Sequence, residues 1–228
     1  MTDDDPDVPP FHAPGEMPPL RLCRDLGRAA MKIHRTRGTG RRFKAYRNLL
    51  RSIFRTAYPP RIALVGAGEG IEVAEAILGL KACARGPSGL DKALYVLHLP
   101  KDAKLIARVR RQPRYAARGA DLVPLLAPWG ETLDKLTATG GFWFSLVAIA
   151  PTVDPDWAIE SLRALRGLCT TGTLIVVCRC NDRPMQKVLA ALDEFGWTAV
   201  RIGEIAALRR GAPAINQHAT PPQEGGHE

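Results

Sequence analysis

The chain has 228 residues, which suits one domain with extensions, and 46% of them are hydrophobic, so a substantial core can form. No apolar run approaches the roughly 18–20 residues that span a bilayer, and the N-terminus lacks the features of a signal peptide. Five cysteines form no CxxC pair, which excludes a disulfide-stapled secreted domain and predicts free thiols in the cytoplasm. The five histidines show no metal-ligand spacing, so we expect no metal.

The net charge of +9 is concentrated in one segment. Residues 1–19 carry five acidic side chains and no basic one, whereas residues 20–61 carry 13 Lys or Arg against Asp25 alone. The remaining residues are close to neutral. We therefore expect four parts: a disordered acidic arm (1–19), a basic helical extension (20–60), an α/β domain (61–210) and a disordered tail (211–228).

The basic extension has helical periodicity. It predicts a first helix from Leu20 to Ile33, a break near Gly38 and Gly40, and a second helix from Arg42 to Ala57. The second helix has one apolar face and one basic face. The apolar face is Tyr46, Leu49, Leu50, Ile53, Phe54 and Ala57, and the basic face is Lys44, Arg47, Arg51 and Arg55. Three interpretations stay open: docking of the apolar face on the sheet with the arginines in water, binding of RNA phosphates, or binding of an anionic membrane surface.

After Pro60 the sequence alternates between strand and helix patterns. Strands are expected at 61–65, 93–99, 121–126, 143–150, 173–179 and 198–202, and helices at 71–83, 103–112, 155–168 and 184–195. Asp154 before Pro155 is a good N-cap, and Gly196 is a good helix stop. Apolar strands that alternate with helices predict an α/β fold with a mostly parallel sheet covered on both faces.

One motif carries chemistry: the first strand leads directly into a turn with Gly66, Gly68 and Gly70. Glycines let a backbone turn sharply and approach a ligand, and the next helix offers free N–H groups. Ile71 stands where a dinucleotide fingerprint requires a small residue, and no GK[ST] follows, so neither NAD or FAD nor a P-loop is favoured. A tight turn without a ligand is the structural alternative.

At this motif the sequence resembles the class I S-adenosylmethionine-dependent methyltransferases over residues 61–205, and most of all the FkbM type. Four later segments are similar in layout to the strands and helices of that type. They are YVLHLPKDAKLIARV, DLVPLLAPWGETL, FSLVAIAPTVDPDWAIESLRALRGLCTTGTLIVVCRC and QKVLAALDEFGWTAVRI. The resemblance implies a Rossmann-like methyltransferase fold with S-adenosylmethionine as cofactor. It also implies O-methylation of a small or carbohydrate-type acceptor.

Two positions depart from the methyltransferase pattern. Leu64 stands where an acid usually precedes the first glycine, and His98 stands where an acid usually binds the ribose hydroxyls. A neutral imidazole offers one acceptor at most. The departures leave two further hypotheses open: a non-catalytic methyltransferase-like protein that binds a partner, and an RNA methyltransferase that uses the basic extension.

The resemblance assigns candidate site residues along the carboxyl edge of the sheet, where such folds bind ligands. Asp154 and Asp156 are the candidates for orienting or deprotonating the acceptor, although both also suit the start of a helix. Glu69 and Glu72 flank the glycine turn, where an acid can meet the amino group of the methionine moiety, although both also suit a helix start; we assign Glu69. The predicted cofactor-binding residues are Gly66, Ala67, Gly68, Glu69, Gly70, His98, Trp129 and Ala150.

Overall fold

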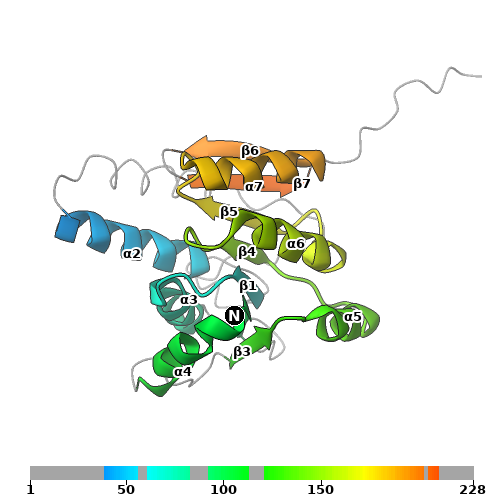
Figure 1. Cartoon of the computed structure of the whole chain (residues 1–228), viewed down its shortest axis with the longest axis horizontal. Coiled ribbons are helices and arrows are strands. Elements are labelled where there is room, and N and C mark those ends of the chain that lie inside the picture. Colours follow the sequence, from blue (N-terminus) through cyan, green and yellow to red (C-terminus); the bar gives the residue numbers. More distant parts are fainter. Residues whose placement is uncertain (1–38, 56–60, 83–91, 113–120, 203–204, 211–228) are drawn as a thin grey trace, which may run out of the picture.

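The structure is a computed structural model that describes residues 39–55, 61–82, 92–112, 121–202 and 205–210 (Figure 1). The predicted first helix, the acidic arm and the C-terminal tail lie outside these residues. One seven-stranded sheet has the strand order β3-β2-β1-β4-β5-β7-β6. The strands are β1 (Arg61–Val65), β2 (Ala93–His98), β3 (Asp121–Leu126), β4 (Leu146–Ile149), β5 (Leu174–Cys178), β6 (Trp197–Ile202) and β7 (Ile205–Arg210). The first five strands pair in parallel, and β7 runs antiparallel between β5 and β6.

Six α-helices cover the two faces of this sheet. One face packs against α2 (Thr39–Arg55), α3 (Ile71–Ala82) and α4 (Ala103–Arg111), and the other against α5 (Gly130–Ala138), α6 (Pro155–Leu165) and α7 (Arg183–Glu194). Alternate residues of each strand point to opposite cores, as Leu64 and Val65 of β1 show. The predicted α/β fold, with a mostly parallel sheet and a preceding helix, is confirmed.

Most element boundaries agree with the prediction to within one or two residues, and five elements differ. Helix α2 begins at Thr39, so Gly40 lies inside it and does not break it. The strand predicted over 143–150 is shorter and spans Leu146–Ile149. Just before it, the N–H groups of Phe144 and Ser145 donate to the carbonyls of Leu168 and Arg61. The predicted helix over 155–168 ends at Leu165 and continues as a 3₁₀ turn. Helix α5 and strand β7 were not predicted.

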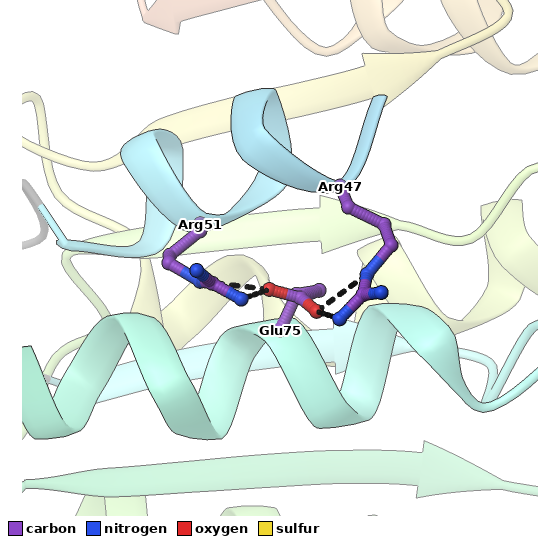
Figure 2. A network of polar contacts seen from close by, with 3 residues as sticks. All are labelled: Arg47, Arg51 and Glu75. Carbon is purple, nitrogen blue, oxygen red and sulfur yellow. Dashed lines mark hydrogen bonds and ion pairs between the residues drawn. The ribbon is translucent and has the colours of Figure 1, made fainter. Parts of the chain in front are cut away.

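Helix α2 packs on α3 and shares its hydrophobic core. Its predicted apolar face is buried at Leu49, Leu50, Ile53 and Phe54. Of the three open interpretations, docking of the apolar face agrees with the structure, but Arg47 and Arg51 are only partly in water. Both guanidinium groups pair with the fully buried carboxylate of Glu75 on α3, at 2.7 Å each (Figure 2). The periodicity could not reveal this, because the partner carboxylate lies in a helix 24 residues further along the chain.

Candidate functional site

The turn after β1 adopts a backbone that requires glycine. Gly66, Gly68 and Gly70 have φ angles of +84°, +58° and +85°, in the left-handed region that side chains with a Cβ rarely adopt. The Gly66 N–H donates to the Leu97 carbonyl of β2, and the Gly70 N–H donates to the Ala67 carbonyl. These bonds hold the turn at the carboxyl edge of the parallel strands, as the sequence predicts.

Each glycine of the turn is in close contact with a different part of the protein. A Cβ atom on Gly66 would lie 3.1 Å from Val153 Cγ2, and one on Gly70 would lie 2.9 Å from Leu105 Cδ1. Close packing therefore accounts for two of the three glycines. The third is different, because a Cβ atom on Gly68 would lie 2.5 Å from the carboxylate atom Oε2 of Glu72. The middle of the turn thus faces a charged group and not an apolar wall.

Glu72 places a buried carboxylate against the turn. Only 4% of the residue is exposed, and burial raises the pKa of its carboxyl above the ordinary value. Its Oε1 atom accepts from the Tyr46 hydroxyl at 3.2 Å, and its Oε2 atom accepts from the Glu69 N–H at 3.3 Å. Within the part of the chain that the structure describes, no cationic side chain pairs with Glu72.

The turn also presents backbone donors. The N–H groups of Ala67 and Gly68 donate to no atom of the described residues. Two free N–H groups can bind a carboxylate, and the nearby Glu72 carboxylate can bind an ammonium group. The turn therefore combines the two kinds of partner that an α-amino acid group requires.

The structure brings several predicted residues together at this turn. Ala150 is 1% exposed, and its N–H donates to the Val65 carbonyl. If Gly66 carried a Cβ atom, that atom would lie 3.4 Å from the Cβ atom of Ala150. Glu69 is exposed and contributes its N–H to Glu72. Its carboxylate was predicted to meet the methionine amino group, but the acid held against the turn is Glu72. Sequence reasoning considered Glu72 without assigning it, and its place in the first turn of α3, directly after the glycines, is the signal that could have selected it.

His98 and Trp129 are buried at the same edge of the sheet. His98 ends β2 with 4% exposure, and its Nδ1 atom lies 3.0 Å from the Leu99 carbonyl oxygen. Trp129 is 6% exposed and packs edge-to-face on Trp157, with ring centroids 5.1 Å apart. Both side chains therefore have packing roles, and their predicted contact with a cofactor stays a prediction.

Asp154 and Asp156 lie in the loop and first turn after β4, and both are exposed. Asp154 is the predicted N-cap of α6, since its Oδ1 atom accepts from the Trp157 N–H at 3.0 Å. Asp156 forms an ion pair with Lys187 of α7. Asp154 follows Val153, whose Cγ2 would lie 3.1 Å from a Cβ atom on Gly66, so the loop that carries Asp154 packs against the glycine turn.

The described residues lack two further features. No group of three or more His, Cys, Asp or Glu side chains there is arranged to hold a metal ion. None of the helices there is both long enough and apolar enough to cross a membrane.

No family model matches the sequence, and no curated protein matches it. Among solved structures, the chain is similar to the O-methyltransferase TomG from Streptomyces achromogenes in complex with SAM (18% identity, 83% of this chain and 90% of that one, TM-score 0.49). It is also similar to an O-methyltransferase from Bacillus cereus in complex with SAH (14%, 83% and 90%, TM-score 0.47). A third similar structure is cofactor-bound Rv0187 from MTB (21%, 84% and 91%, TM-score 0.46).

Proposed function

We propose that the chain binds S-adenosylmethionine at the glycine turn and transfers its methyl group to a hydroxyl oxygen of a small acceptor. The observation that carries this proposal is the buried Glu72 carboxylate, which lies against Gly68 without a cationic partner among the described residues. A buried carboxylate without a counter-charge is unfavourable, so a cationic ligand group is the natural complement.

The donor set of the turn fits the methionine end of this cofactor. The free N–H groups of Ala67 and Gly68 suit its carboxylate, and Glu72 suits its ammonium group. Methyltransferases usually carry an acid just before the glycine turn, where this chain has Leu64. Glu72 would supply that acid from the other side of the turn. The resemblance of the strand–GxGxG–helix segment to class I methyltransferases supports the same assignment.

The bound cofactor would supply an electrophilic methyl group attached to a sulfonium. The turn would hold the cofactor so that an acceptor hydroxyl could take the methyl group as the methyl–sulfur bond breaks and sulfur keeps its electron pair, and a carboxylate of the chain would receive the hydroxyl proton. This chemistry depends mainly on positioning. Asp154 is the better candidate base, because one of its oxygens is free of the cap interaction, whereas Lys187 partly neutralises Asp156.

The acceptor is proposed from the resemblance alone. It implies a small or carbohydrate-type molecule with a free hydroxyl, and the exposed position of Asp154 in the β4–α6 loop is compatible with an acceptor that arrives from solvent. A partner-binding protein that has lost the reaction is the alternative, because no acid stands at His98 to bind a ribose.

Calorimetry with S-adenosylmethionine and S-adenosylhomocysteine tests the proposal through a pair of glycine variants. Gly68→Ala strains a left-handed residue and pushes a methyl group against Glu72, so we expect at least a tenfold loss of affinity. Gly141→Ala is the matched control, because Gly141 has φ +65° and open space around its Cβ position. It should carry the same backbone strain and bind as the wild type does.

Two results would contradict the proposal. The first is folded wild-type protein that binds neither ligand at millimolar concentration. The second is equal affinity in the Gly68→Ala and Gly141→Ala variants, which would place the ligand elsewhere. Binding without methyl transfer to any hydroxylated acceptor would favour the non-catalytic alternative.

A further inference from the structure

The Glu72 carboxylate is reached from outside the α/β unit by one hydroxyl, that of Tyr46 on α2. This hydroxyl donates to Oε1 at 3.2 Å, while the Glu69 N–H donates to Oε2. Tyr46 also lies beside the Cys178 thiol at the end of β5. Burial raises the pKa of the tyrosine and raises the pKa of Cys178 to about 12, so both groups stay protonated near neutral pH. Glu72 is therefore held by two neutral donors, the Tyr46 hydroxyl and the Glu69 N–H.

The place of Tyr46 is set by a closely built contact between α2 and α3. At one end, a Cβ atom on Gly79 would lie 2.6 Å from Phe54 Cβ, so the two helices approach each other as closely as glycine permits. In the middle, Arg47 and Arg51 both pair with Glu75 (Figure 2). Tyr46 precedes Arg47, and Glu72 precedes Glu75 by about one helical turn. The same contact thus ends at the glycine turn.

We propose that Tyr46 is a positioning residue of the cofactor site, whose hydroxyl holds the Glu72 carboxylate against Gly68 to receive the ammonium group of the ligand. This inference rests on the proposed function. It makes α2 a component of the binding site, and it assigns to this part of the basic extension a role other than contact with RNA or membrane.

The hydrogen bond and the packing of Tyr46 can be separated by substitution. Tyr46→Phe keeps the ring that packs against the core but removes the hydroxyl. A hydrogen bond to a charged group contributes enough that its loss should weaken binding about ten- to a hundredfold. The same bond is present in the ligand-free protein, so the unfolding temperature should fall as well, and the comparison of affinity with a structural control is the deciding measurement.

The control is Arg51→Gln, which removes one arm of the contact with Glu75 and leaves the groups around Glu72 in place. We expect it to lower the unfolding temperature while it changes affinity for S-adenosylhomocysteine less than Tyr46→Phe does. In a Glu72→Gln background, Tyr46→Phe should have little further effect on affinity, because the carboxylate that it positions is absent.

A second measurement needs no cofactor. Titration of carbon-13-labelled glutamate side chains by NMR reports the pKa of Glu72, which the groups facing it (Tyr46, Cys178 and Glu69) influence. Removing the Tyr46 hydroxyl removes a bond that favours the ionised form, so the Glu72 titration should move to higher pH in Tyr46→Phe and stay in place in Arg51→Gln.

The outcomes distinguish this inference from the proposed function. Wild-type protein that binds no ligand, together with a shifted Glu72 titration in Tyr46→Phe, would reject the proposed function and leave the Tyr46–Glu72 contact standing. An unchanged affinity and an unchanged titration in Tyr46→Phe would overturn the inference. Equal loss of affinity in Tyr46→Phe and Arg51→Gln with no change in titration would also overturn it, because helix docking alone would then explain the effect.

Discussion

Glu72 is in an environment that suits its neutral form when no ligand is bound. Its carboxylate lies in the first turn of α3, where the helix dipole favours a negative charge, and it accepts two hydrogen bonds. These interactions do not offset its burial, because the pKa of the carboxyl remains raised. Ionisation of Glu72 therefore opposes folding, and the negative charge makes the turn selective for a cation.

Glu72→Gln should consequently change stability and binding in opposite directions. The amide carries no charge to bury, so we expect the ligand-free variant to unfold at a higher temperature than the wild type at pH 7. Its advantage should disappear as the pH falls toward the ordinary glutamate value, because the wild-type carboxyl then becomes protonated too. Affinity for S-adenosylmethionine should fall about tenfold or more. Thermal unfolding across pH measures the gain in stability, and calorimetry measures the loss of affinity. A lower unfolding temperature of Glu72→Gln than of the wild type at pH 7 would contradict this account.

At the scale of elements, the contact between α2 and α3 combines an ionic centre with a close helix approach. Glu75 is fully buried between two arginines that remain about one-third and two-fifths exposed, at 32% and 42%. The guanidinium groups can therefore neutralise the carboxylate and still reach water. Gly79 permits this arrangement, since its nearest neighbours across the contact include the backbone of Arg51 and Arg55.

Gly79→Ala should destabilise the protein, although the same change in an exposed helix interior stabilises by about 1 kcal/mol. The new methyl group would lie 2.6 Å from Phe54 Cβ and 3.0 Å from the Arg55 backbone nitrogen, so α2 must shift. We expect a loss of about 1–3 kcal/mol in the free energy of unfolding, as for other overpacked sites. Gly130→Ala, with nothing near its Cβ position, is the control and should be neutral or slightly stabilising. Denaturant unfolding of both variants measures the difference.

For the whole molecule, the net charge of +9 is distributed less simply than the sequence implies. Arg47 and Arg51 of the basic extension are committed to an internal contact. A second group of cations lies along α4 and the turn before it, where every one is exposed and none pairs with an acid of the described residues. This group is Lys101, Lys104, Arg108, Arg110 and Arg111.

We expect this α4 group to dominate the binding of polyanions at low salt. Arg108→Glu should make the protein elute from a heparin column at lower salt, because it interrupts the row of cations. Arg183→Glu at the start of α7 changes the net charge equally but removes an exposed cation outside this row, so it should elute closer to the wild type. Equal shifts in the two variants would show that net charge alone controls the binding.

The sequence was sufficient for the alternating core of the fold and for the place of the glycine turn. Strands such as β1 and β3, and the Asp154 cap of α6, follow from local patterns, because apolar periodicity and capping residues act within a few positions of the chain. Helix α5 was missed because it buries only Leu133, so its apolar signal is weak. Strand β7 was missed because it follows β6 with few turn residues to mark it.

What the tertiary structure alone decided is which charged residues turn inward. Arg47, Arg51, Glu72 and Glu75 lie on helical faces that, in a sequence, are typical of solvent. The burial of the two glutamates and the pairing of the two arginines with Glu75 depend on how α2 crosses α3, and that crossing depends on the shape of Gly79 against Phe54, residues 25 positions apart. Local periodicity identifies the apolar face of one helix, but a buried carboxylate and its partners become visible only when two helices are placed together.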